Sequence, residues 1–242
     1  MKNFNQPFTG FDEGLFSFLA DLSKNNNVEW FRENRHRYEN FLVKPARSFI
    51  SEIAPFFNQI DSAIRTEPKF DQTIMRINKD MRFTKGEPYR NYFLIHFGKF
   101  KMDSEFFLYF EDGLAQIGLF INNSVGDDFY LSKNLDKNLK AIQEVSIKYK
   151  YGNYSVYELG KETTKLFTKF DPVKQVFKLK ATKHILLQKN IPPGKKSLFK
   201  AEFLIEAIKI FSALYPLYCF ATSPNPQKKI SNFEDSFGFP AK

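Results

Sequence analysis

Apolar residues recur at helical spacing in the first sixty positions of the chain. The earliest of them follow the i, i+3, i+4, i+7 pattern of one buried helix face: Leu15, Phe18, Leu19 and Leu22. This stripe stops at the run 24–27, where an asparagine is suited to end one helix and to cap the next. The pattern therefore predicts a helix that ends near residue 24, a second over 28–43, and a third that begins at Pro45, since proline fits a first helical turn.

From residue 72 to residue 122 the apolar period changes to two residues, which is the spacing of strands. Four strands are predicted, at about 72–83, 91–100, 104–111 and 114–121. Links of two or three residues join the last three strands, and links this short imply antiparallel hairpins.

Alternation along these strands predicts one apolar face, with residues such as Phe93, Phe106 and Ile117. If all the apolar sets share that face, the opposite face gathers polar and charged side chains: Arg76, Asp80, Arg82, His96, Tyr109, Glu111 and Gln116. The chain is therefore expected to be an α+β protein. Its mostly antiparallel sheet of four or more strands would pack against N-terminal and C-terminal helices.

The second half of the chain supports fewer assignments. Asp127 or Asp128 is expected to cap a helix that runs to about residue 145, and no regular pattern is assigned over 150–196. Ser197 is expected to cap a last helix, which Pro216 ends. The predicted inner residues of that helix are Leu204, Ile205, Ile208 and Phe211.

Domain organisation is predicted from the absence of repeats and linkers. No internal repeat and no clear linker divides residues 1–221, which we expect to form a single α+β domain. Prolines and lysines follow residue 222, and this composition favours an extended or disordered tail over 222–242.

Composition narrows the class of protein. The 242 residues are 43% apolar and include 30 phenylalanines, so the core should be rich in aromatic rings. The single cysteine, Cys219, excludes an internal disulfide, fits a reducing compartment and lies in an apolar stretch typical of a packed, inert thiol. The chain has no signal-peptide-like run at its start, and no segment approaches the ~20 apolar residues of a bilayer span. We expect a cytoplasmic protein with no membrane partner.

The formal net charge of +9 is concentrated in one segment. Residues 172–201 contain eight lysines, no arginine and no acidic residue, a strip that can attract nucleic acid. The lysines considered for such contacts are Lys174, Lys178, Lys180 and Lys183. A solvated lysine-rich surface is the simpler explanation, since nucleic-acid sites usually add arginine and stacking aromatic residues, and only Phe177 and Phe199 lie in this segment.

The strongest candidate for chemistry is the charged segment 76–85. Arg76 and Arg82 are expected to hold an anion bidentately, while Asp80 orients one of the guanidinium groups. The other residues of this predicted site are Lys85, Tyr89 and Arg90, which would close over the anion, and Tyr109 on the same sheet face. The alternative is a structural network in which Asp80 ties an arginine to the fold.

His96 is the only histidine in the predicted sheet and is the candidate general base, although a lone histidine of this kind is commonly a hydrogen-bonded structural residue. The chain contains no HExxH, CxxC, Walker, GxGxxG or GxSxG motif. We therefore predict no metal and no cofactor, and whether the protein is an enzyme stays open.

Two motifs are specific in their spacing. The first is N-N-x-x-E-W-F at 25–31, followed by Tyr38 and Pro45, and the second is R-I-x-x-D-x-R-F-x-K at 76–85, followed by P-Y-R at 88–90. Together they resemble a family of conserved hypothetical proteins from bacteria and fungi, known only as a domain of unknown function. The resemblance covers about 11–125 and implies an α+β fold without an established activity. Between Lys85 and Pro88 this chain has two residues where the family usually has three.

These observations leave three functional hypotheses. The first is binding of a small phosphate- or carboxylate-bearing ligand on the arginine-rich sheet face. The second is association with nucleic acid through the lysine strip over 174–200. The third is a structural or interaction protein without catalytic activity, which would use its phenylalanine-rich tail.

Overall fold

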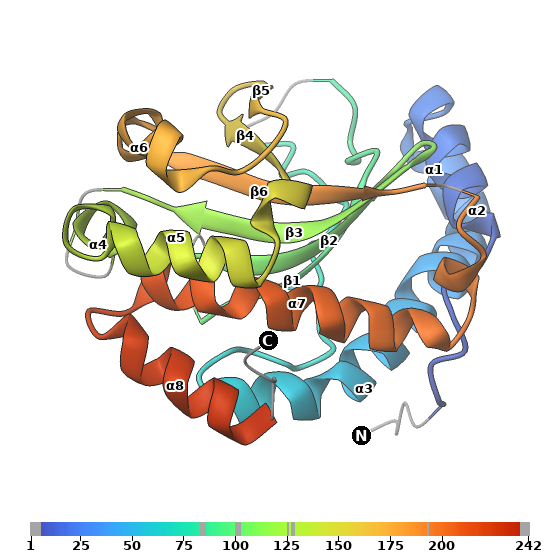
Figure 1. Ribbon diagram of the computed structural model, residues 1–242. Coiled ribbons are helices and arrows are strands. Elements are labelled where there is room, and N and C mark those ends of the chain that lie inside the picture. The colour runs from blue at the N-terminus through green and yellow to red at the C-terminus, as the bar shows by residue number, and fades with distance from the viewer. Residues whose placement is uncertain are drawn as a thin grey trace. The chain divides into compact units, whose positions relative to one another are not determined.

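The computed structural model describes residues 6–82, 86–99, 103–124, 126, 129–192 and 194–237 (Figure 1). The strands are β1 (Phe93–Phe97), β2 (Glu105–Glu111), β3 (Leu114–Asn122), β4 (Ser155–Leu159), β5 (Thr163–Phe167) and β6 (His184–Ile191). The helices are α1 (Gly14–Lys24), α2 (Val28–Tyr38), α3 (Lys44–Ile60), α4 (Leu131–Lys137), α5 (Leu139–Lys148), α6 (Pro172–Ala181), α7 (Glu202–Thr222) and α8 (Pro226–Phe237). A π-helical turn spans Glu39–Val43, and short 3₁₀ helices span Tyr151–Asn153 and Lys196–Phe199.

The six strands form one antiparallel sheet in the order β1-β2-β3-β6-β4-β5, which confirms the predicted α+β class. The strands expected after residue 91 are present as β1, β2 and β3. Their predicted apolar residues are almost completely buried: Phe93, Ile95, Phe97, Phe106, Leu108, Phe110, Ala115, Ile117, Leu119 and Ile121. The three remaining strands arise from the region 150–196, to which no pattern was assigned.

Contacts divide the chain into two compact units. The first comprises the chain up to Phe97 together with Phe107–Ile117 and Asn190–Ile208. The second comprises Gly98–Phe106, Gly118–Lys189 and the chain from Lys209 onward. The expectation of one domain over 1–221 therefore stays a prediction.

In the first unit, aromatic rings join the N-terminal helices to the sheet. The ring of Phe11 lies 4.9 Å from that of Phe110 on β2 and 5.6 Å from that of Phe49 on α3. The rings of Phe57 and Phe97 stack at 4.3 Å and join α3 to β1. The aromatic core that the composition predicts is thus present.

The helix boundaries of this unit follow the predicted caps in part. The Asn27 side chain accepts a 2.9 Å hydrogen bond from the Trp30 amide and starts α2. The predicted position of Pro45 in the first turn of a third helix is confirmed, although α2 continues through the π-helical turn Glu39–Val43 into α3 without a break. Pro45 lies in the first turn of α3, directly after this local change in hydrogen-bond pattern, where a missing N–H is tolerated.

In the second unit, α7 continues past Pro216, so the prediction that this proline ends the helix is wrong. The Tyr151 hydroxyl donates a 2.7 Å hydrogen bond to the Ala213 carbonyl and accepts a 3.3 Å bond from the Leu217 amide. These are backbone groups that an uninterrupted helix would bond to each other. A buried phenol therefore replaces the helical bond beside the proline, and the helix persists to Thr222.

Several other helical expectations need correction. The helix expected up to residue 145 is two helices, α4 and α5, which meet at Asn138, and its predicted caps Asp127 and Asp128 lie outside the described residues. Ile205 is 57% exposed rather than inward. Phe211 is buried as predicted, whereas Leu204 and Ile208 are only half-buried. The other buried residues in this part of α7 are Phe203, Ala207 and Leu214.

The tail is not extended over its described part. Residues Pro226–Phe237 form α8, which runs back along α7 in Figure 1. Ile230 and Phe233 are buried, and the Phe233 ring lies 4.8 Å from that of Tyr215 on α7. Apolar residues at helical spacing thus outweigh the proline and lysine content that favoured an extended tail.

Helix α7 also corrects the expectation that no segment approaches a bilayer span. By length and composition it is apolar enough to cross a membrane, but 61% of its most apolar window is buried within the protein. The buried core helix of a globular protein has the same composition.

We predict that Tyr151→Phe lowers the free energy of unfolding by about 1–3 kcal/mol, because it leaves the Ala213 carbonyl and the Leu217 amide unsatisfied inside the protein. Urea denaturation measures this loss. The control is Tyr154→Phe, because this second buried tyrosine makes no side-chain hydrogen bond to the described residues. Equal losses in the two variants would contradict the account of α7.

Candidate functional site

The charged segment predicted as a strand over 72–83 is not a strand in its described part, 72–82. It makes isolated bridges, between Ile74 and Ile95 and between Asn78 and Tyr89. Asp71 has a φ of 63°, and a turn follows it, so the chain enters this segment through a bend. Asp and Asn favour turns over strands, and here they outweigh the two-residue alternation.

Residues 77–79 and 88–90 pair along a short stretch of backbone. The Lys79 amide donates to the Pro88 carbonyl at 2.8 Å, and the Arg90 amide donates to the Ile77 carbonyl at 2.7 Å. Arg90 Nη1 also donates to the carbonyls of Arg76 and Asn78, at 3.0 and 2.7 Å. Arg90 and the backbone of Tyr89 therefore anchor the segment, and the expectation that these residues close over an anion stays a prediction.

Asp80 and Arg82 pair with each other at an exposed position. Arg82 Nε and Nη2 donate to the two Asp80 oxygens at 3.0 and 2.7 Å, and the Arg82 side chain is 81% exposed. This hydrogen bonding holds the pKa of the Asp80 carboxyl below its ordinary value. A contact of this kind is compatible with the structural alternative, in which Asp80 holds an arginine. The predicted site residue Lys85 lies outside the described residues.

Arg76 lies instead in a cavity of about 390 Å³ in the first unit, which we call the arginine cavity. Helix α2 and the turn after it line one side, with Val28, Phe31, Arg32, Arg35, Tyr38 and Glu39. The segment 70–89 lines the other side, with Phe70, Arg76, Asn78 and Tyr89. Three arginines from two separate parts of the chain thus face one space.

Arg32 and Arg35 are the site residues that sequence reasoning missed. Arg35 lies four residues after Phe31 and three before Tyr38, and residues three or four apart share a helix face. Arg32 lies three residues before Arg35, so the same spacing links it to this face. This helical spacing is the signal in the sequence that points to the two arginines.

Tyr89 joins the two sides of the cavity, because it contacts both Asn26 and Phe31. The Asn26 side chain donates to the Tyr89 carbonyl and accepts from the Tyr89 amide, both at 3.0 Å. The ring of Tyr89 stacks on that of Phe31, with centroids 4.3 Å apart. The N-terminal and central motifs therefore meet at this cavity.

The arginines of the cavity differ in how they are held. Arg76 Nε donates to Asp71 at 2.7 Å, and its guanidinium carbon lies 5.2 Å from the centre of the Phe70 ring. Neither Arg32 nor Arg35 makes a hydrogen bond or an ion pair with any residue in the described part of the chain. Arg76 is thus oriented, while the other two guanidinium groups have no carboxylate partner there.

Tyr38 is the buried polar group of the cavity. Burial is the main cause that raises the pKa of its phenol well above the ordinary value. The negative charge of Glu39 acts in the same direction, and the positive charges of Arg47, Arg76 and Arg35 oppose it. The phenol therefore stays protonated near neutral pH and can donate a hydrogen bond to an anion.

Two further predicted site residues lie elsewhere on the sheet. The His96 amide donates to the Thr73 carbonyl at 3.0 Å, and its side chain is half-buried on β1. The Tyr109 hydroxyl donates to Glu111 at 2.8 Å, and burial raises the pKa of this phenol. Neither residue lines the arginine cavity, so the predicted grouping of His96, Tyr109 and the arginines is not found.

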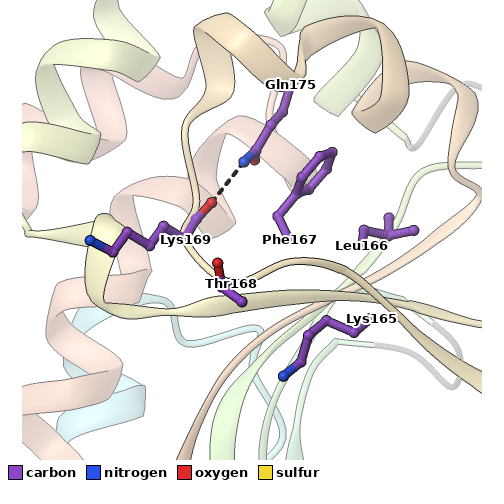
Figure 2. A pocket seen from close by; sticks show the side chains of 6 residues that line it. All are labelled: Lys165, Leu166, Phe167, Thr168, Lys169 and Gln175. Atoms are coloured by element: carbon purple, nitrogen blue, oxygen red, sulfur yellow. Dashed lines mark hydrogen bonds between the residues drawn. The ribbon is translucent and has the colours of Figure 1, made fainter.

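A second, more open cavity of about 440 Å³ lies in the second unit, between the end of β5 and α6 (Figure 2). The Gln175 side chain donates to the Lys169 carbonyl at 2.7 Å (Figure 2). It also accepts from the Asp171 amide at 3.0 Å. The polar groups of the Gln175 side chain therefore form hydrogen bonds within the fold. The charged side chains that line this cavity are those of Lys165 and Lys169.

The lysine strip is distributed over several elements. Three of the four lysines considered for nucleic acid have carboxylate partners: Lys174 with Asp171 at 3.6 Å, Lys178 with Glu158 at 3.8 Å and Lys180 with Asp136 at 2.6 Å. These partners lie outside the strip in sequence, so the segment is less positive in the folded protein than its composition indicates.

Among the described residues, no three His, Cys, Asp or Glu side chains gather in a way that would hold a metal ion.

A family model described as "Conserved hypothetical protein (DUF2461)" matches residues 14–220. The match extends well beyond the region 11–125 over which the two motifs indicate a resemblance. Searches of curated proteins and of solved structures each returned no match.

We predict that Asn26→Ala lowers the free energy of unfolding by about 1–3 kcal/mol, because the amide and carbonyl of Tyr89 lose their partner. Urea denaturation measures the change. Asn25→Ala is the control, since the Asn25 side chain bonds only the Asp21 carbonyl at an exposed helix end and should cost less than about 0.5 kcal/mol. If Asn26→Ala costs no more than this control, Asn26 does not fasten the cavity.

Proposed function

Because the chain belongs to the DUF2461 family of conserved hypothetical proteins, whose description assigns no activity, we propose its function from the arginine cavity. The proposal is that the protein binds a small anionic ligand, phosphate- or carboxylate-bearing, between α2 and the segment 70–89. The observation that carries it is the convergence of Arg32, Arg35 and Arg76 on one cavity.

The electrostatics support an anionic ligand. Like charges brought to one space repel each other, and this repulsion is relieved when an anion enters. Arg32 and Arg35 have no carboxylate partner in the described part of the chain, so a bound anion would supply one. The volume of about 390 Å³ lies within the range of small-molecule sites.

The proposal moves the site from the sheet face to the cavity. Arg76 and Tyr89 remain in it, and Arg90 supports it through the backbone of Arg76 and Asn78. We further propose that the protein acts in the cytoplasm, since its single cysteine is buried and needs no oxidising compartment.

Arg35→Gln is expected to weaken the binding of inorganic phosphate and of small carboxylates by roughly tenfold, because a charged hydrogen bond contributes about 1.5–3 kcal/mol when shielded and less when exposed. Thermal stabilisation by each anion measures binding. The matched control is Arg82→Gln, which removes an exposed arginine that pairs with Asp80 outside the cavity. Equal losses in the two variants, or no stabilisation of the wild type, would refute the proposal.

A second candidate function rests on Phe177, which is 86% exposed on α6 between Lys174 and Lys178. An exposed ring flanked by lysines is the arrangement on which single-stranded nucleic acid stacks. Lys165 and Lys169 line the nearby hollow that includes Gln175 of α6 (Figure 2). The carboxylate partners of Lys174, Lys178 and Lys180 count against it, so it ranks second.

If this second function holds, Phe177→Ser should reduce affinity for oligothymidylate by about 1–3 kcal/mol, the contribution of one stacked base. Fluorescence anisotropy at two salt concentrations measures it, because binding to phosphates weakens with salt. Ile205→Ser is the control, since Ile205 is also exposed but lies on α7. Salt-sensitive binding that Phe177→Ser leaves unchanged would rule out a stacking role.

A further inference from the structure

We infer that the ligand of the arginine cavity is a phosphate monoester of a small molecule with an apolar body. This inference rests on the proposed function and names the class of anion. It follows from the net charge of the cavity, from the directions of its donors and from its apolar lining.

The charge of the cavity matches a dianion. Its lining carries three arginines and one acidic residue, Glu39, which gives a net charge of +2 while the Tyr38 phenol is protonated. Behind the lining, Asp71 holds Arg76, and the guanidinium carbon of Arg47 lies 5.7 Å from the centre of the Phe70 ring. A phosphate monoester carries about −1.5 to −2 at pH 7, whereas a monocarboxylate or a sulfate ester carries −1.

The donors approach from two directions. Arg32 and Arg35 extend from α2, and Arg76 extends from the facing segment with its Nε bonded to Asp71. The terminal nitrogens of Arg76 make no hydrogen bond within the described residues, so they remain available. A tetrahedral anion with three terminal oxygens can accept from donors on both sides, whereas a planar carboxylate is met by a single guanidinium fork.

The remaining lining fits an organic body. Val28 and the stacked pair Phe31 and Tyr89 provide apolar surface beside the arginines. Phe31 and Tyr89 already stack on each other, so the ligand would contact the outer surface of this pair without inserting between the rings. The cavity lies in the volume range that holds a small organic molecule as well as its anionic group.

The test compares three probes that share one ring: phenyl phosphate, phenyl sulfate and benzoate. Titration calorimetry with the full chain at pH 7.5 should give the tightest binding for phenyl phosphate, by about tenfold over phenyl sulfate, because one charge is added at constant shape. Phenyl sulfate should in turn bind more tightly than benzoate, because the sulfate group is tetrahedral at the same charge.

The pH dependence gives an independent readout. The second pKa of a phosphate monoester lies near 6, so the dianion is lost as the pH falls to 5, and the advantage over phenyl sulfate should disappear. Burial raises the pKa of Tyr38, so its phenol stays protonated over this range. Any effect of protonating Glu39, Asp71 or the exposed His36 on α2 applies to the sulfate ester as well, so the ratio of the two affinities isolates the ligand's own charge.

The outcomes separate the two proposals. Equal affinities for phenyl phosphate and phenyl sulfate at pH 7.5, or a ratio that does not change at pH 5, would overturn the phosphate inference and leave the anion site standing. Absence of binding by all three probes, or binding that Arg35→Gln leaves unchanged, would refute the anion site as well. Arg35 is an exposed helical residue, and circular dichroism of Arg35→Gln confirms that the variant is folded.

Discussion

Two hydrogen bonds between the Asn26 side chain and the backbone of Tyr89 join the segments that form the arginine cavity. They connect residues 63 positions apart, and the stack of Phe31 on Tyr89 adds an apolar contact at the same place. Arg90, the next residue, holds the carbonyls on either side of Ile77. The position of Arg76 opposite α2 depends on this chain of contacts, because segment 70–82 has no regular secondary structure of its own.

The arginines of this protein show how local geometry separates a structural charge from a candidate binding group. Arg82 is satisfied two residues away by Asp80, in an exposed pair of the kind that contributes little to stability. Arg32 and Arg35 lie on a helix whose neighbouring carboxylate, Glu39, makes no ion pair with them. Arg76 is held through Nε alone, which fixes its direction and leaves its terminal nitrogens for another partner. This difference in how the arginines are held is the basis of the proposed anion site.

The sequence predicted the N-terminal helices, the strands β1 to β3 and two of the residues that line the cavity, Arg76 and Tyr89. Strands β1 to β3 were predictable because their alternation coincides with burial, as at Phe93, Ile95 and Phe97. The same alternation does not produce a strand over 72–82, because turn-forming residues determine the backbone conformation there. The predicted strand face therefore includes Asp80 and Arg82, which do not line the cavity. Arg76 and Tyr89 were found, but Arg32 and Arg35 were not, since only tertiary packing shows which helix face meets segment 70–89. The prediction that Pro216 ends a helix failed for a related reason. Tyr151, 65 residues earlier, forms hydrogen bonds with the backbone groups beside this proline.

The central claim is that Arg32, Arg35 and Arg76 act together on one anion. The most direct measurement is a titration of the protein with phenyl phosphate, observed through the Nε–H resonances of its arginines by NMR and assigned with single Arg→Lys variants. The account predicts that the resonances of Arg32, Arg35 and Arg76 shift together along one binding curve while that of Arg82 stays in place. Shifts of Arg82 equal to those of Arg35, or separate curves for the three cavity arginines, would contradict it.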